Sequence, residues 1–156
     1  SEESKAKVEL AKEKLETILR LSDLGGTVTI AYYDNAKVEL NISDTEELGR
    51  IIGKDGVAIN ALQTLVRQFI YQEFKSGMRV QIDAADYKRK REQALKKESE
   101  EAADKIRMGI EESVELTEMN ASERRYVHGL FEGDRKVKSY SVGEGRRRHV
   151  ILEKHG

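Results

Sequence analysis

The feature that most constrains this fold is a pair of glycines three residues apart, Gly53 and Gly56, set between two apolar patterns with helical spacing. Leu48, Ile51 and Ile52 precede the pair and predict a short helix that stops at Gly53. Apolar residues after the pair recur at the i, i+3, i+4, i+7 spacing of a buried helix face. These residues are Ala58, Leu62, Leu65, Val66 and Phe69. The local plan is therefore helix, glycine-bracketed turn, helix.

The glycine-bracketed turn is suited to binding a phosphate backbone. Glycine lets a ligand approach the main chain closely, and the second helix presents unpaired N–H groups and the positive end of its dipole at this turn. The competing interpretation is a helix corner that serves packing alone. Asp55 weighs against tight binding, because its carboxylate repels phosphate.

The segments around this turn predict an α+β domain. An amphipathic helix is expected over residues 5–22, and Ser43 with Glu46 predicts a capping box for the short helix before Gly53. Alternation predicts a hairpin with its turn at Asp34-Asn35, and then a third strand after the second helix. The alternating residues are Val28, Ile30, Tyr32, Val38, Leu40 and Ile42 in the hairpin, and Met78, Val80 and Ile82 in the third strand.

The segment Ile52-Gly53-Lys54-Asp55-Gly56 resembles the I-G-x-x-G signature of K homology (KH) domains. The expected order, α-β-β-α-α-β, is that of a type II KH domain, which we assign to residues 1–85. In such domains the GXXG loop clamps about four nucleotides by their backbone. The resemblance therefore implies nucleic-acid binding by Gly53, Lys54, Asp55 and Gly56, with Asn60 and Gln63 as candidates for contacts to base edges.

Charge is distributed unevenly along a chain whose net charge is only −1. Residues 1–86 carry 11 Lys and Arg against 15 Asp and Glu, whereas residues 87–156 carry 17 against 14. From Arg124 onward there are 9 basic and 4 acidic residues, together with all 3 histidines. This asymmetry predicts an anionic partner for the second half.

Composition is that of a two-domain protein of a reducing compartment. The chain has 156 residues, 38% of them hydrophobic, which suits two small cores. Cysteine is absent, which excludes disulfides and thiolate metal sites. The apolar runs are only a few residues long, so we expect neither a secretory signal nor a membrane span, and we expect a cytoplasmic location.

Residues 86–108 predict a long, charged and mostly solvated helix that joins two domains. Its apolar positions are sparse, and it begins with the basic run from Lys88 to Arg91. That run is either a track for a phosphate backbone or an ordinary solvated face. The second domain, taken together with this helix, is assigned to residues 86–156.

A short strand around Val114 to Thr117 is followed by a helix whose N-terminus is predicted by Asn120 with Glu123. Arg124 and His128 are four residues apart and share one flank of this helix, where both can donate hydrogen bonds to one phosphate. The spacing resembles the signature of the small single-stranded nucleic-acid-binding domain named for an Arg and a His separated by three residues, here the Arg-x3-His domain.

The C-terminal residues support this resemblance. Residues 137–142 and 147–152 predict two strands joined by Gly143-Glu144-Gly145, as in that family. We expect Arg146, Arg147 and Arg148 to open the last strand and to add phosphate contacts beside Arg124 and Arg125. The competing interpretation is a basic edge strand that protects itself from aggregation.

A KH domain, a charged helix and a small α/β Arg-x3-His domain, in that order, resemble the bacterial Jag family, also called SpoIIIJ-associated or KhpB/EloR proteins. The resemblance covers nearly the whole chain. It implies a cytoplasmic RNA-binding protein linked to cell elongation, division and envelope homeostasis, and some members pair with a small KH-only protein. Members usually start with a further N-terminal Jag domain. This chain begins at Ser1, so we expect a longer natural N-terminus, and it lacks the prolines that often precede the Arg-x3-His helix.

We therefore expect a protein that binds single-stranded RNA, or single-stranded DNA, without a cofactor or metal. One alternative is an interaction scaffold whose KH domain mediates dimerisation or binds a partner protein and has little RNA affinity. An enzyme is the other alternative. It is disfavoured because the sequence shows no carboxylate cluster with metal-ligand spacing, no supported Ser/His/Asp set and no Walker or dinucleotide loop.

Overall fold

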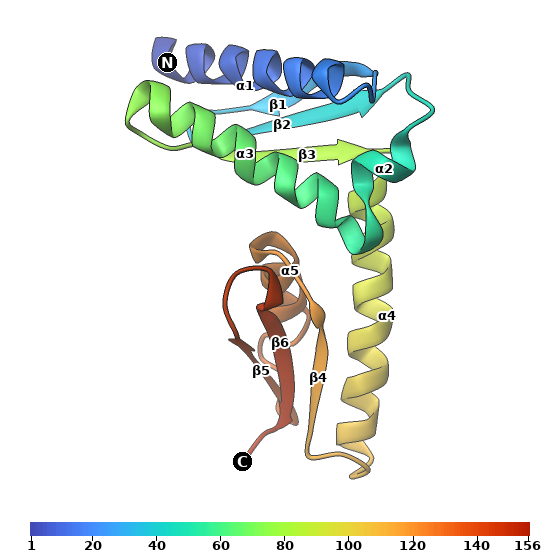
Figure 1. Ribbon diagram of the computed structural model, residues 1–156. Coiled ribbons are helices and arrows are strands. Elements are labelled where there is room, and N and C mark those ends of the chain that lie inside the picture. Colours follow the sequence, from blue (N-terminus) through green and yellow to red (C-terminus); the bar gives the residue numbers. More distant parts are fainter. The chain divides into compact units, whose positions relative to one another are not determined.

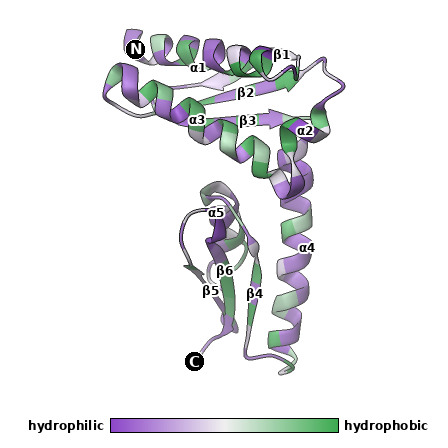
Figure 2. Cartoon of the chain, viewed as in Figure 1, coloured by the Kyte–Doolittle hydropathy of each residue, from purple (hydrophilic) through white to green (hydrophobic).

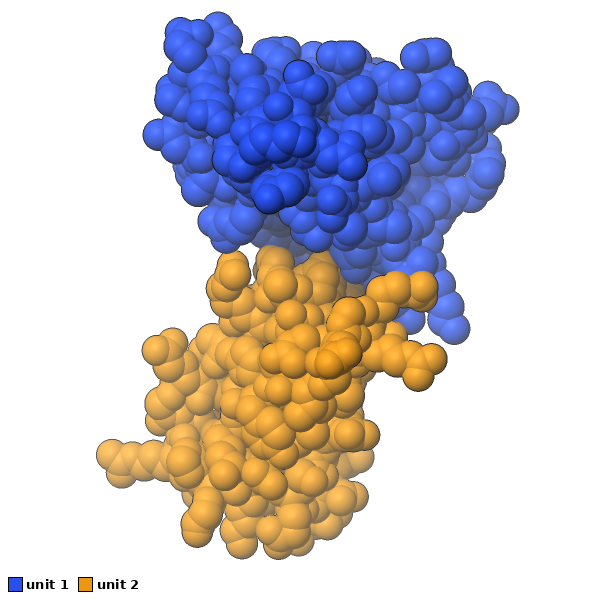
Figure 3. Space-filling view, turned by 60° about the vertical axis from the view of Figure 1, so that its left-hand side comes forward, with its two compact units in different colours: residues 1–88 blue, residues 89–156 orange.

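The computed structural model describes all 156 residues, which form two compact units, Ser1–Lys88 and Arg89–Gly156 (Figure 3). The elements of the first unit are α1 (Glu2–Leu21), β1 (Thr27–Tyr33), β2 (Lys37–Ser43), α2 (Leu48–Ile52), the 3-10 turn η1 (Lys54–Gly56), α3 (Val57–Phe74) and β3 (Arg79–Ala84). This order confirms the predicted α-β-β-α-α-β succession. No helix anywhere in the chain combines the length and the apolar character needed to cross a membrane.

The sheet of the first unit has the order β1-β2-β3. The hairpin pairs β1 with β2 in antiparallel fashion, whereas β2 and β3 are parallel, with Leu40 opposite Ile82. Helices α1 and α3 cover one face of this sheet (Figure 1). The core between them is built from aliphatic side chains with almost no exposure, among them Leu15, Leu19, Leu40, Ile42 and Ile70.

Two details around the glycine pair differ from expectation. The predicted Ser43–Glu46 capping box is wrong, because α2 begins only at Leu48 and no side chain caps it. The preceding loop is held instead by Thr45, whose hydroxyl donates to the carbonyl of Leu24 at 2.6 Å and accepts the N–H of Glu47 at 3.0 Å.

The buried face of α3 is also rotated from the predicted one. Ile59, Val66 and Ile70 form its buried stripe, whereas the side chain of Leu65 is 44% exposed. A residue one position before Val66 lies about 100° around the helix, which turns Leu65 away from the core. Helix α3 packs on both α1 and β3, so its contact face is set by two neighbours that the local apolar pattern does not reveal.

The second unit is built on a three-stranded antiparallel sheet with the order β4-β6-β5. Helix α4 begins just before the unit boundary, and the last strand is six residues long. The elements are α4 (Tyr87–Arg107), β4 (Ser113–Glu118), α5 (Ala121–Leu130), β5 (Val137–Val142), the 3-10 turn η2 (Gly145–Arg147) and β6 (His149–Lys154). These bounds confirm the long helix, the short strand, the second helix and the final hairpin.

Helix α4 is more than a solvated connection. One of its faces is buried in the core of the second unit, and Figure 2 shows the corresponding apolar positions within an otherwise hydrophilic helix. The buried residues are Leu95, Ser99, Ala102, Ala103 and Ile106. Small side chains such as Ala and Ser let the sheet approach closely, and for this reason the apolar pattern looked sparse in the sequence.

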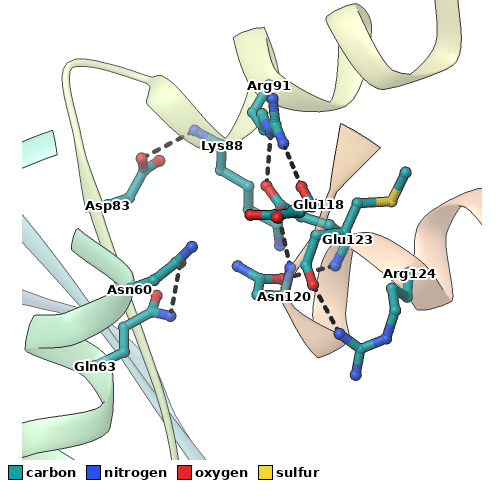
Figure 4. A network of polar contacts seen from close by, with 10 residues as sticks. Asn60, Gln63, Asp83, Lys88, Arg91, Glu118, Asn120, Glu123 and Arg124 are labelled. Atoms are coloured by element: carbon teal, nitrogen blue, oxygen red, sulfur yellow. Dashed lines mark hydrogen bonds and ion pairs between the residues drawn. The ribbon is translucent and has the colours of Figure 1, made fainter. Parts of the chain in front are cut away.

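A buried ion pair ties α4 to the N-terminus of α5 (Figure 4). The Arg91 Nε donates to the Glu123 carboxylate at 2.9 Å, and Arg91 Nη2 donates to the carbonyl of Glu118 at 3.0 Å. Glu123 also accepts the N–H of Asn120, whose side chain accepts the N–H of Glu123, so the predicted capping box is confirmed. Arg91 is therefore engaged within the protein, and the basic run beginning at Lys88 is not a uniform solvated face.

We predict that Arg91→Leu lowers the free energy of unfolding of the second unit by about 3 kcal/mol, because it leaves the Glu123 carboxylate buried without its partner. Both side chains are only about a tenth exposed, 11% and 10%. Adding Glu123→Gln should restore part of the loss, since the amide oxygen can still accept the N–H of Asn120. Urea unfolding followed through amide resonances of β6 measures both effects. Equal stability of the parent and Arg91→Leu would contradict this assignment.

Candidate nucleic-acid interface

The glycine corner between α2 and α3 is fixed by close packing of the main chain. Gly53 and Gly56 have φ angles of 74° and 77°, in the region that favours glycine. A Cβ atom on Gly53 would lie 2.8 Å from the nitrogen of Ala58, and one on Gly56 would lie 2.5 Å from the hydroxyl oxygen of Tyr87. Both glycines are therefore required by the protein's own packing, whether or not a ligand binds.

The two residues between the glycines face solvent. Lys54 and Asp55 are exposed, and Asp55 has a positive φ of 53°, which Asp and Asn tolerate better than most residues. Gly56 is the N-cap of α3, and no side chain caps this helix. The corner thus presents a lysine, a carboxylate and the positive end of a helix dipole on one exposed loop.

Gln63 has a different place from the one expected. Its side-chain oxygen accepts the N–H of Ile82 at 2.9 Å, so the amide is joined to the main chain of β3. Its side-chain nitrogen lies 3.5 Å from the side-chain oxygen of Asn60. The hypothesis that both residues contact bases thus meets a network in which Gln63 already satisfies a strand N–H group.

The predicted Arg124 and His128 pair lies on one flank of α5, as its spacing requires. Arg124 is half-buried, and its Nη1 donates to the carbonyl of Met119 at 2.7 Å. The imidazole of His128 contacts two hydroxyls of β5: Nδ1 lies 2.7 Å from the oxygen of Ser139, and Nε2 lies 2.8 Å from the oxygen of Ser141. Both ring nitrogens are thus satisfied inside the unit.

The electrostatics keep this imidazole neutral. Burial lowers the pKa of His128, and the positive charges of Arg124 and Arg148 lower it further. A neutral imidazole donates from one nitrogen and accepts at the other. One of the two serine hydroxyls therefore accepts from the ring and keeps its own O–H free to donate to another group.

Ser139 and Ser141 are site residues that the sequence analysis missed. They stand two apart on β5, so they lie on one face of the strand, next to α5. The signal was present in the alternation of Ser139 and Ser141 with the exposed residues Lys138 and Tyr140. Serines in a strand are too common, however, to point to a histidine before the fold is known.

The three consecutive arginines precede the last strand instead of opening it. Arg146 and Arg147 lie in the η2 turn, and β6 starts only at His149. Arg148 is half-buried and donates from Nη1 to the carbonyl of Gly143 at 2.8 Å. The turn takes this path because Gly143 has a φ of 88° and its main chain approaches that of Arg147 closely.

The structure thus brings only part of the predicted set together. Arg148 and Arg124 both act on the pKa of His128, which places these three side chains in one cluster. Arg125, Arg146 and Arg147 are exposed.

Comparison with known proteins gives matches for both units. A family model described as the KhpA/KhpB KH domain matches residues 9–82, and a model of the Arg-x3-His domain matches residues 93–154. The chain is similar to the RNA-binding protein KhpB of Clostridium symbiosum, with 30% identity over 143 residues that cover 91% of this chain and 64% of the relative.

Two further relatives carry the same name. The RNA-binding protein KhpB of Bacillus subtilis (strain 168) is 29% identical over 147 residues, covering 93% of this chain and 69% of the relative. That of Streptococcus pneumoniae serotype 2 (strain D39) is 30% identical over 141 residues, covering 89% and 42%. The chain therefore spans between 42% and 69% of the length of these three relatives.

We predict that Gly56→Ala lowers the free energy of unfolding of the first unit by about 2 kcal/mol, from the positive φ and the contact of the new Cβ with Tyr87. Gly49→Ala is the matched control, because a Cβ there meets no atom within 4 Å and the residue lies inside α2. The control should be stabilised by about 0.5 kcal/mol. Urea unfolding followed through amide resonances of β2 measures both variants. A Gly56→Ala protein as stable as the control would refute the packing argument.

Proposed function

This chain belongs to the KhpB/Jag family, with a KH domain followed by an Arg-x3-His domain, and we propose that it is a cytoplasmic protein that binds single-stranded RNA through both units. The family match and the name of the relatives support RNA as the ligand. The observation that carries the proposal is the glycine corner, where an exposed Lys54 stands at the N-terminus of a helix that no side chain caps.

In the first unit, main-chain groups would hold the phosphate backbone. N–H groups at an uncapped helix N-terminus favour anions, and Lys54 adds a positive charge beside them. Gly53 and Gly56 keep the loop free of side chains that would block the approach. Asp55 opposes this attraction, so the corner should bind a short stretch weakly.

In the second unit, side chains would do the same work. Arg124 spends one N–H on the carbonyl of Met119 and keeps further donors in its guanidinium. The free hydroxyl hydrogen of Ser139 or Ser141, oriented by His128, would donate to a phosphate oxygen. The exposed Arg125, Arg146 and Arg147 would contribute charge and little geometry, so affinity should depend strongly on salt and weakly on sequence.

We propose binding and not catalysis for this cluster. Both nitrogens of the His128 ring are taken by serine hydroxyls, which leaves no imidazole nitrogen to act as a general base toward a ligand. From the family we further propose a role in cell elongation, division or envelope homeostasis, and pairing with a small KH-only protein. The second candidate function is an interaction scaffold, which is favoured by the exposed carboxylate of Asp55 in the loop.

We predict that Lys54→Asp weakens binding of an unstructured RNA oligomer about tenfold or more, because it replaces an attractive charge with a second carboxylate beside Asp55. Asp55→Asn should strengthen binding, since it removes the repulsion and keeps a side chain that tolerates positive φ. Fluorescence anisotropy at fixed salt measures both. Lys5→Asp, an equal charge change at an exposed position of α1, is the control and should bind as the parent does.

The same assay tests the second unit with Arg124→Ala combined with His128→Ala, after circular dichroism has shown that the variant is folded. If this variant and Lys54→Asp both bind RNA as well as the parent, the proposed function is wrong. If the parent binds no RNA but forms a complex with a KH-only protein, the scaffold function replaces it.

A further inference from the structure

A groove in the second unit carries positive side chains that the cluster around His128 does not use. It is open to solvent and runs beside the C-terminal half of α5, the following turn and the start of β5, which is an edge strand of the sheet. His128 and Ser139 form part of its lining, so the groove begins at the candidate site. Its positive lining residues are Arg125, Arg135, Lys138 and His155.

Most of the negative charge near this groove is already compensated. Asp134 accepts from Arg107 at 2.6 Å and from the N–H groups of Lys136 and Val137. These main-chain contacts, together with Arg107, hold the pKa of the Asp134 carboxyl below its usual range, so it stays ionised and paired. Glu132 is the remaining acidic residue of the lining.

The cations of the groove, by contrast, are largely uncommitted. The exposed Arg125 and Arg135 make no hydrogen bond or ion pair within the protein. Lys138 is nearly half-exposed and has only a surface contact of 3.4 Å with Glu153, a type of pair that contributes little in water. Gly129 and Gly133 also line the groove, and a Cβ on either would meet no atom within 4 Å, so its wall is free of bulky side chains there.

We infer that this groove is an additional binding site for the phosphodiester backbone, in which Arg135 and Lys138 hold phosphates of the strand that continues from His128 and Ser139. The inference rests on the proposed function and extends it, because it assigns residues outside the Arg124 cluster and fixes the side of α5 along which the strand runs. A phosphate chain suits the groove because each uncommitted cation can accept one phosphate without breaking an internal contact.

The test compares Arg135→Ala/Lys138→Ala with Lys136→Ala/Lys154→Ala, in the full chain. Both variants lose two positive charges from the same hairpin, but Lys136 and Lys154 are exposed residues that do not line the groove. Anisotropy titrations with an oligouridylate of about 12 nucleotides, over salt concentrations from about 50 to about 200 mM, give the slope of log K against log salt. We expect the groove variant to lower the magnitude of this slope by about 1.4, or about 0.7 per lost phosphate contact on a single strand, and the control to leave it nearly unchanged.

The outcomes separate this inference from the proposed function. If the parent and Lys54→Asp show the expected RNA binding but both double variants keep the parental slope, the groove site is wrong and the proposed function stands. Equal losses in the two double variants would also overturn it, since they would show a general charge effect. Loss of binding to an acidic peptide with RNA binding intact would assign the groove to a protein partner. If the parent binds no RNA at all, the proposed function fails first.

Discussion

The start of one helix decides how each unit is built around its candidate site. A helix leaves its first N–H groups without partners, and something must satisfy them. Helix α5 solves this internally, because Asn120 and Glu123 form a capping box and Arg91 compensates the Glu123 charge. Helix α3 begins at Gly56 without a side-chain cap. The first helix start is closed by the protein, and the second is left to solvent or to a ligand.

This difference explains why the two units would hold a strand by different means. At α3 the main chain is accessible, and the glycines that make it so are also demanded by the packing of Ala58 and Tyr87. At α5 the N-terminus is occupied, so the flank of the helix must provide side chains. There His128 orients two serines and keeps its own nitrogens inside, which makes it a positioning residue more than a direct contact.

Local patterns were enough to predict much of the structure. The glycine pair, the hairpin and the Asn120–Glu123 box depend on neighbours within a few residues, and each was confirmed. The errors have a common cause in tertiary contacts. The buried face of α3 was set by α1 and β3, so Leu65 was misplaced, and the arginines after Gly145 were assigned to a strand because the 3-10 turn has no apolar pattern of its own.

The site was predictable in outline only. Spacing placed Arg124 and His128 on one flank of α5, but spacing cannot show that Ser139 and Ser141 occupy both nitrogens of the imidazole ring. Likewise, the run from Lys88 contained no sign that Arg91 pairs with a carboxylate 32 residues later in the chain. Such partners become visible only when distant segments are brought together.

The most direct test of the account is an amide NMR titration of the chain with an unstructured single-stranded RNA. If each unit holds the phosphate backbone as described, resonances of residues 53–58 and of the β5–β6 hairpin with its η2 turn should both shift and saturate with added RNA. The resonances of β1 should stay in place. Saturation by RNA with the residues 53–58 unmoved, or with the hairpin unmoved, would contradict the claim that both units hold the strand.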